Sequence, residues 1–191
     1  MKGLIELKMD QFTDAIQSYG RAVELDPSSA EAYRGLAAAQ FAAGMITEAK
    51  STFEATVQRF SHDSLQYQEY GKLLLKLGET GDSAAESRGI QLLEAALKLD
   101  GSLSEPHYYL GNLAMKRGKI EEAAKHLEEA TRLDPKGSRN YYALARAYRR
   151  LGRSGDAERQ FQRYRELKAE EENGSNFVDF LRDNSGEQEP R

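Results

Sequence analysis

The sequence of 191 residues contains no cysteine. This absence excludes disulfide bonds, thiolate zinc sites and a cysteine nucleophile. Long apolar runs are missing as well, because the least polar stretch, residues 36–46, contains Gln40 and is much shorter than the roughly 20 residues that cross a bilayer. No signal peptide is recognisable, since Met1 and Lys2 lead straight into a patterned segment. We therefore expect a soluble chain that does not insert into a membrane, and the sequence assigns it to no compartment.

Residues suited to catalysis or metal binding are also scarce. The three histidines, His62, His107 and His126, do not stand at metal-ligand spacing, and no glycine-rich phosphate loop follows a predicted strand. Acidic pairs such as Glu121–Glu122 are expected on outer helix faces as solvated charge. The net charge of −4 and the lack of a recognition motif argue against nucleic-acid binding. These observations predict a protein without a metal, a cofactor or enzymatic activity.

What the sequence does contain is an internal repeat, which is clearest in SEPHYYLGNLAMKRGKIEEAAKHLEEATRLDPKG at residues 104–137. This unit predicts a helix at about 105–117, a turn at Gly118, a second helix at about 120–133 and a stop at Asp134–Pro135. Each predicted helix carries one narrow apolar stripe. The unit is therefore a helix hairpin that cannot bury both of its stripes alone.

Small and large apolar residues recur in register every 34 residues, with one step of 40. The small residues of the first helices are Gly3, Ala37, Gly71, Gly111 and Ala145, and those of the second helices are Ala15, Ala49, Gly89, Ala123 and Ala157. The turn glycines are Gly44, Gly78, Gly118 and Gly152, and the large residues of the second helices are Tyr19, Phe53, Leu93, Leu127 and Phe161. Facing small residues let two helices approach closely, while a large side chain one turn further fills the space toward the next unit. We therefore predict that the hairpins stack on one another.

In this pattern of small and aromatic positions the chain resembles the tetratricopeptide repeat (TPR) family. The matching first-helix positions are Tyr33, Leu36 and Ala37; Tyr67, Tyr70 and Gly71; His107, Leu110 and Gly111; and Tyr141, Leu144 and Ala145. The resemblance covers residues 1 to about 168. It implies an all-α fold, a right-handed α-solenoid of about five stacked antiparallel helix hairpins.

We expect repeat units at about 1–29, 30–63, 64–103, 104–137 and 138–172. The six additional residues of the third unit fall in the polar segment 79–88. We expect them to lengthen the turn or the start of the second helix, and we interpret them as a tolerated loop insertion rather than a functional loop. The last helix of the fifth unit is expected to end at Asn173–Gly174. Residues 173–191 are predicted to form a short amphipathic cap, in which Phe177, Phe180 and Leu181 cover the last hairpin, followed by a disordered polar tail.

Members of the TPR family bind extended or helical peptides in a concave groove lined by the first helices, and the resemblance implies the same surface here. The candidate groove residues are Arg34, Gln68, Lys72, Tyr108, Asn112, Lys116, Arg139, Tyr142, Arg146, Arg149 and Arg150. The first helix of unit five carries four arginines and no acid, which favours an anionic ligand. The alternative interpretation is a solvated basic face, because cations near a helix C-terminus interact favourably with the helix dipole.

Two sources of an acidic ligand follow from these residues. Some TPR proteins hold the C-terminal carboxylate of a chaperone tail, and Asn112 and Arg139 fit that arrangement, but Tyr108 and Ala143 stand where Lys and Asn are expected. We therefore do not carry this activity over. Within the chain itself, residues 169–190 contain seven acids and one base, Arg182. One hypothesis is an intramolecular contact of this acidic tail with the basic end of the groove, and a disordered solubilising tail is the alternative.

The sequence thus predicts a protein–protein interaction scaffold, not an enzyme, that binds a peptide or partner segment in the concave groove. An acidic segment is favoured at units four and five. The alternative is a non-catalytic targeting or regulatory TPR segment of a larger enzyme or assembly factor, because the register places the start of the first helix upstream of Met1 and favours a fragment.

Overall fold

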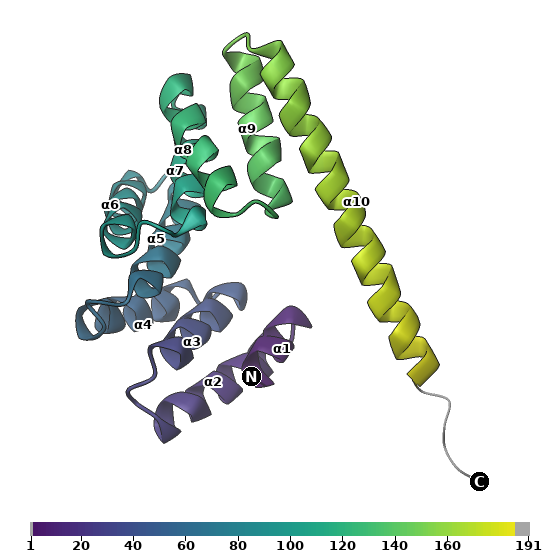
Figure 1. Ribbon diagram of the computed structural model, residues 1–191. Coiled ribbons are helices and arrows are strands. Elements are labelled where there is room, and N and C mark those ends of the chain that lie inside the picture. Colours follow the sequence, from purple (N-terminus) through teal and green to yellow (C-terminus); the bar gives the residue numbers. More distant parts are fainter. Residues whose placement is uncertain (1, 186–191) are drawn as a thin grey trace. The chain divides into compact units, whose positions relative to one another are not determined.

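Helix hairpins make up the computed structural model, which describes the backbone of residues 2–185 and the side chains of residues 2–173. Within that part of the chain every regular element is a helix. The hairpins are α1 (Lys2–Lys8) with α2 (Phe12–Leu25), α3 (Ala30–Ala42) with α4 (Ile46–Arg59), α5 (Ser64–Gly78) with α6 (Ser83–Leu99), α7 (Ser104–Lys116) with α8 (Ile120–Leu133), and α9 (Ser138–Arg150) with α10 (Ser154–Ser185) (Figure 1). The predicted all-α hairpin fold is confirmed.

The chain divides into two compact units, residues 1–106 and 107–191. In the first unit, the core contains Phe53 of α4, whose ring stacks on Tyr70 of α5 with centroids 5.3 Å apart. In the second unit, the core is built around Leu127 of α8 and Leu144 of α9, both buried. Each core joins residues of successive hairpins, as expected if one hairpin cannot bury its apolar faces alone.

The small-residue columns lie where two helices of a hairpin approach most closely. Between α5 and α6, a Cβ atom added to Gly71 would lie 3.1 Å from the carbonyl oxygen of Gly89, and one added to Gly89 would lie 3.0 Å from the carbonyl oxygen of Gly71. These contacts are with backbone atoms, which cannot rotate away. Any larger residue at either position would push the two helices apart.

The turn glycines follow the prediction in three of the four hairpins for which one was predicted and depart from it in the third hairpin. Gly44, Gly118 and Gly152 have φ values of 78°, 76° and 73°. In the third hairpin the prediction of Gly78 is wrong, because Gly78 is the last residue of α5 and the positive φ belongs to Gly81 instead. A Cβ atom on Gly78 would lie 2.7 Å from the Cβ of Glu86, so Gly78 is a close-packing position. Asp10 takes the corresponding turn position in the first hairpin, with a φ of 57°.

The six additional residues of the third hairpin do not form a separate loop. The helices α5 and α6 have 15 and 17 residues, whereas α3 and α4 have 13 and 14. The connection between α5 and α6 is only residues 79–82, and the side chain of Asp82 accepts a hydrogen bond from the Ala85 amide at 2.9 Å. Capping by Asp82 therefore starts α6 early, and most of the insertion lengthens the two helices at their turn.

The predicted helix end at Asn173–Gly174 is wrong, because α10 continues through both residues to Ser185. An internal Gly costs a helix only about 1 kcal/mol relative to Ala, and α10 contains no proline. The ion pairs Arg163–Glu166 and Lys168–Glu171 support the preceding turns at i,i+3 spacing. The capping contacts predicted for Phe177, Phe180 and Leu181 lie outside the described side chains.

Candidate functional site

Arg34, the candidate groove residue of α3, forms an ion pair inside the first unit. Its guanidinium lies 2.5 Å from Oδ2 of Asp63. The other carboxylate oxygen of Asp63 caps α5, accepting a hydrogen bond from the Leu65 amide at 3.0 Å. Arg34 is thereby tied to the start of the next hairpin, and an anionic ligand would have to compete with Asp63 for it.

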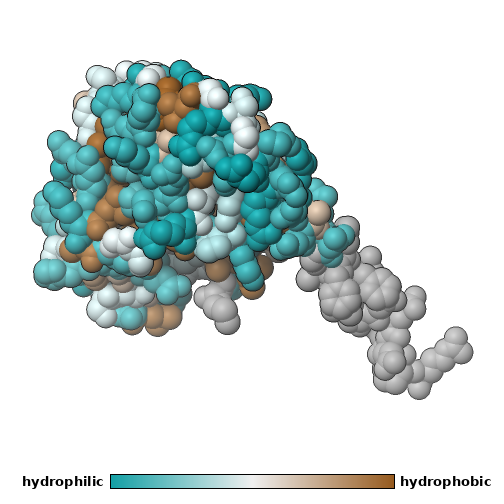
Figure 2. All heavy atoms as spheres, turned by 45° about the horizontal axis from the view of Figure 1, so that its top comes forward, coloured by the Kyte–Doolittle hydropathy of each residue, from teal (hydrophilic) through white to brown (hydrophobic). Residues whose placement is uncertain are grey.

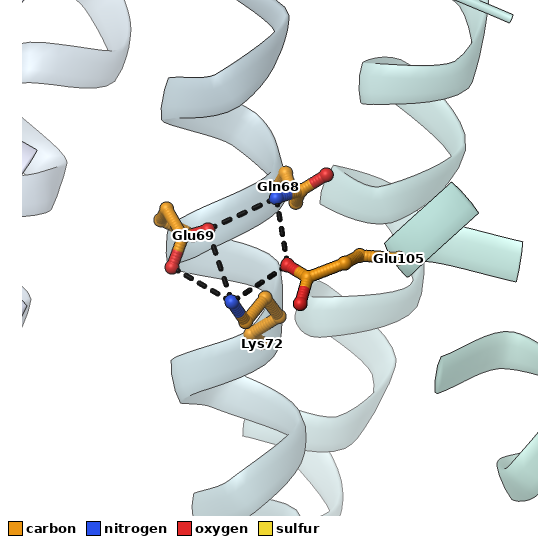
Figure 3. Close-up of polar contacts among 4 residues, drawn as sticks. All are labelled: Gln68, Glu69, Lys72 and Glu105. Carbon is orange, nitrogen blue, oxygen red and sulfur yellow. Dashed lines mark hydrogen bonds and ion pairs between the residues drawn. The ribbon is translucent and has the colours of Figure 1, made fainter. Parts of the chain in front are cut away.

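Gln68 and Lys72 of α5 form a polar network with Glu69 and with Glu105 in the first turn of α7 (Figure 3). The Lys72 ammonium group lies 3.0 Å from Glu69 and 2.8 Å from Glu105. The Gln68 amide donates hydrogen bonds to Glu69 at 3.0 Å and to Glu105 at 2.9 Å. Burial works to lower the pKa of Lys72, but the two carboxylates outweigh it and raise the pKa. With two carboxylates around one ammonium group, this network carries no excess positive charge for an acidic ligand.

Three candidate residues lie on α7 in the second unit. Asn112 donates a side-chain hydrogen bond to the Tyr108 carbonyl at 2.8 Å, so its amide is used within its own helix. The Tyr108 ring is partly buried and receives the guanidinium of Arg139, whose Cζ lies 4.6 Å from the ring centre. Lys116 is exposed in the last turn of α7. Of these three, Tyr108 is thus joined to a candidate residue of the next hairpin.

The helix α9 carries a stripe of arginines on one face. We define the arginine stripe as Arg139, Arg146 and Arg149, with Tyr142 between them; the spacing of three, four and three residues keeps all four on one side of the helix. Arg146 lies over the Tyr142 ring, 5.9 Å from its centre. Arg149 lies over the ring of Phe161 on α10, 5.6 Å from its centre. Tyr142 and Arg149 of the stripe thus border α10, whereas Arg139 contacts Tyr108 of α7.

The stripe combines positive charge with aromatic surface. Tyr142 is 43% exposed, and its ring packs against Phe161 at 5.8 Å and Tyr164 at 5.2 Å. Within the described side chains, no carboxylate forms an ion pair with Arg146 or Arg149, both of which are exposed. Hydrophilic residues dominate the face shown in Figure 2, and apolar residues appear there as small separate patches. The exposed groups of the stripe are guanidinium groups and the Tyr142 ring, so a ligand of the stripe would be held by charge and ring contacts.

Other arginines at the end of α9 have structural partners. Arg150 donates a hydrogen bond to the Met115 carbonyl at 2.8 Å, near the C-terminus of α7. Arg153 lies 4.1 Å from the ring centre of Tyr148 and pairs with Asp156 at 2.6 Å. Satisfying helix carbonyls with cations is the behaviour expected at a helix C-terminus. Arg150 therefore belongs to the packing of the second unit more than to a ligand surface.

A pair of histidines that sequence reasoning left as unrelated is brought together between α7 and α8. Nδ1 of His107 and Nδ1 of His126 are 3.0 Å apart, so that one imidazole donates its N–H and the other accepts. Burial and then the charge of His126 lower the pKa of His107. The repeat pattern could have predicted this contact, because Gly111 and Ala123 face each other across the hairpin. The two helices are antiparallel, so His107, four residues before Gly111 on α7, lies near His126, three residues after Ala123 on α8.

Groups of side chains typical of a metal site are not found in the described residues. No three histidine or acidic side chains there are grouped closely enough to hold a metal ion. A pocket of about 560 Å³ opens among α1, α2 and α3, where its lining includes Glu6, Tyr19 and Arg21 but no histidine. None of the described helices is both apolar enough and long enough for a transmembrane span.

Comparison with family models gives matches over most of the chain. A model described as TPR repeat matches residues 3–44, and models described as tetratricopeptide repeat match residues 31–62, 87–138 and 108–172. Between residues 3 and 172 these matches omit 63–86, a segment that contains the start of the lengthened third hairpin. The irregular spacing found in the sequence thus coincides with the gap.

Relatives and solved structures agree with these matches. Hsp70-Hsp90 organizing protein 1 of Glycine max is 27% identical over 155 residues, which are 79% of this chain and 26% of the relative. The TPR repeat-containing protein MJ1428 of Methanocaldococcus jannaschii is 23% identical over 160 residues, which are 82% of this chain and 28% of the relative. The chain therefore spans about a quarter of the length of these relatives.

Among solved structures, the TPR protein TTC0263 of Thermus thermophilus superposes with a TM-score of 0.73 at 20% identity, covering 86% of this chain and 87% of that one. PilF of Pseudomonas aeruginosa gives 0.74 at 20% identity, with 86% and 72% covered. MamA gives 0.67 at 20% identity, with 90% and 96% covered. At this identity the likeness concerns the fold alone.

Proposed function

Since the chain belongs to the tetratricopeptide repeat family, a family of protein-interaction scaffolds, we propose that it binds an acidic segment of a partner protein on the arginine stripe of α9. Its role in this proposal is recognition and not catalysis. The relevant groups are the Arg146 and Arg149 guanidinium groups, which supply charge, and the Tyr142 ring, which supplies contact area. A carboxylate accepts two parallel hydrogen bonds from one guanidinium group, which makes arginine well suited to this task.

The observation that carries this proposal is the absence of carboxylate partners for Arg146 and Arg149 among the described side chains, on a face that also exposes Tyr142. Other candidate cations differ in this respect. Arg34 pairs with Asp63, and Lys72 pairs with two glutamates. Positive charge that is already balanced gains little from an acidic ligand, so the stripe is the favoured surface.

A second candidate function is a recognition segment within a larger protein. It is favoured by the length of the curated relatives, of which the chain spans about a quarter. One of these is named for organising Hsp70 and Hsp90, but Tyr108 and Ala143 replace the Lys and Asn expected for holding a chaperone tail. We therefore propose an internal acidic segment as the ligand in preference to a chaperone C-terminus.

The proposal is tested with a fluorescent peptide rich in Asp and Glu, titrated with the full chain while anisotropy is recorded. Replacing Arg146→Glu and Arg149→Glu together should weaken binding at least tenfold, because about 1.4 kcal/mol corresponds to one decade and each exposed ion pair is worth up to about 1 kcal/mol. Affinity should also fall as salt rises from low ionic strength, since the contacts are exposed.

The matched control is Arg159→Glu with Arg165→Glu, which changes the net charge equally on exposed positions of α10. Circular dichroism of both variants reports whether the helices persist. Binding that is equally weakened in both variants would indicate general charge attraction, and binding unaffected in either would remove the stripe as the contact surface.

A further inference from the structure

The pocket among α1, α2 and α3 contains a buried carboxylate that the packing of these helices does not satisfy. The three helices contact one another within the first unit (Figure 1). Glu6 of α1 lines the pocket and is only 8% exposed. Its Oε1 lies 3.2 Å from the Lys2 ammonium group, whereas its Oε2 is buried without a hydrogen-bond partner among the described residues. A buried charged oxygen without a donor is costly, so this acceptor is available to a ligand that brings one.

The repeat register shows that a charge at this position is unusual. Glu6 stands three residues after the small residue Gly3. Its counterparts in the following hairpins are Gln40, Leu74, Ala114 and Tyr148. The last three are buried members of the core, and Gln40 accepts a hydrogen bond from the Thr52 hydroxyl at 2.8 Å. A charged side chain at a packing position breaks the pattern of the repeat, and such exceptions are expected at functional sites.

The lining of the pocket has an excess of negative charge. Its charged members are Glu6, Asp14 and Glu31 on the acidic side and Lys2 and Arg21 on the basic side. The charge of Arg21 is offset by Glu24, at 2.9 Å on the surface of α2. The Lys2 side chain is 82% exposed, so that its contact with Glu6 is readily exchanged for another. The pocket therefore attracts a cation.

Glu6 keeps its charge near neutral pH. Interaction with the Ser18 hydroxyl, and then with Lys2, lowers the pKa of Glu6 against the opposing effect of burial. The carboxylate is thus in the form that accepts hydrogen bonds from a cation.

An aromatic ring forms another wall of the pocket. A Cβ atom added to Gly3 would lie 2.8 Å from the Tyr19 ring, and one added to Gly35 of α3 would also meet this ring. The two glycines thus make room for Tyr19 between α1 and α3. Burial and then the charge of Glu31 raise the pKa of Tyr19, so its hydroxyl remains neutral. Carboxylates beside an aromatic ring are suitable surroundings for an ammonium group on an alkyl stem.

We propose that this pocket binds a lysine side chain of a partner protein. The ammonium group donates a hydrogen bond to Oε2 of Glu6, and the methylene stem lies against the Tyr19 ring. Lysine fits better than arginine, because a guanidinium group pairs best with both oxygens of a carboxylate and Lys2 already contacts Oε1. The site differs from the arginine stripe in its position, in the first unit, and in the charge of its ligand.

A fluorescent peptide of alternating Lys and Ser, titrated with the full chain, tests the pocket. Glu6→Gln should weaken binding at least tenfold, because it removes the charge from a buried ion pair while keeping the shape of the side chain. The matched control is Glu48→Gln on α4, which changes the net charge equally at an exposed position and should bind like the unmodified chain. The same peptide with acetylated lysines should not bind, since acetylation removes the charge.

Lys2 allows a test in the opposite direction. In the free protein its ammonium group competes for Glu6, so Lys2→Ala should strengthen binding of the lysine peptide. The gain should reach up to about fivefold, which corresponds to one exposed ion pair. Lys8→Ala removes the same charge from an exposed position of the same helix and should give no such gain.

Four outcomes would overturn the proposal. The first is a Glu6→Gln variant that keeps its helical content and binds as tightly as the unmodified chain. The second is equal weakening by Glu6→Gln and Glu48→Gln, which would indicate general charge attraction, and the third is equal binding of the acetylated peptide. The fourth is equal affinity of Lys2→Ala and Lys8→Ala, which decides the matter even if Glu6→Gln fails to fold.

Discussion

Asp10 closes the first hairpin in a backbone conformation that Gly44, Gly118 and Gly152 adopt in other hairpins. Its φ of 57° lies in the left-handed region, where a Cβ atom is unfavourable. Removing the Cβ atom relieves about 1–2 kcal/mol of strain, part of which the larger backbone entropy of Gly offsets. We therefore expect Asp10→Gly to raise the free energy of unfolding by about 0.5–1 kcal/mol, measured by urea denaturation. Asp10→Val should lower it, because a β-branched residue fits this region poorly. Equal stability of all three proteins would contradict this assignment of strain.

We expect the contact between His107 and His126 to make the stability of the second unit depend on pH. Burial and the neighbouring imidazole lower the pKa of His107 below its ordinary value, so the unfolded chain binds more protons than the folded chain as the pH falls toward 6. Stability should therefore decrease on going from pH 7.5 to pH 5.5. Glu129 and Arg132 also act on His107, the first raising and the second lowering its pKa.

The measurement is the melting temperature at the two pH values. His107→Gln should reduce the difference between them, whereas the exposed His62→Gln should leave it as large as in the unmodified protein. This window lies above the ordinary pKa of Asp and Glu, so that carboxyl groups contribute little. If the melting temperature of the His107→Gln variant still depends on pH as strongly as that of the unmodified protein, other groups cause the dependence.

At the scale of the helix, α10 shows how far local signals determine an element. Asn173–Gly174 has the composition of a helix end, yet the helix passes through it. We expect Gly174→Pro to end α10 early, because proline lacks the amide hydrogen and clashes with the preceding turn. Circular dichroism should then show the loss of up to the 12 residues 174–185, whereas Gly174→Ala should lose none. Identical spectra for the proline and alanine variants would contradict a helix that crosses residue 174.

Most of the fold could be predicted from the sequence, because the repeated small and large residues indicate helix contacts at many positions independently. The bounds of α8, residues 120–133, agree with those expected from its apolar register and the Asp134–Pro135 stop. The errors arose where the prediction depended on a single residue. Gly78 keeps the 34-residue step and so predicts a turn, although the insertion moves the turn to Gly81.

The candidate site was predictable to a lesser extent for a physical reason. Helical register places a residue on a face, but it does not say which neighbour neutralises its charge. Lys72 and Arg146 occupy matching positions in their repeats, yet Lys72 is held by Glu105 of the next hairpin. Such pairs depend on side-chain conformations across hairpins, which no single repeat encodes.

At the scale of the whole molecule, the cores are local. One group of buried residues lies within residues 37–92 and another within 114–157. Helices pack on their sequence neighbours, as α2 does on α3 and α8 on α9. In a stacked-hairpin chain, stability is the sum of such nearest-neighbour contributions. A substitution that destabilises one hairpin should therefore have its largest effect on that hairpin and its sequence neighbours.

This locality predicts an uneven response to Leu127→Ala. Leu127 is fully buried in α8, and removing such a side chain costs about 2–5 kcal/mol. Amide hydrogen exchange followed by mass spectrometry should show protection lost mainly in α7, α8 and α9, with α3 and α4 changed less, because local openings there do not expose Leu127. The matched variant Phe53→Ala should give the reverse pattern, since Phe53 belongs to the core of the first unit. If each substitution lowers protection equally along the chain, the molecule unfolds as one cooperative body and the nearest-neighbour description fails.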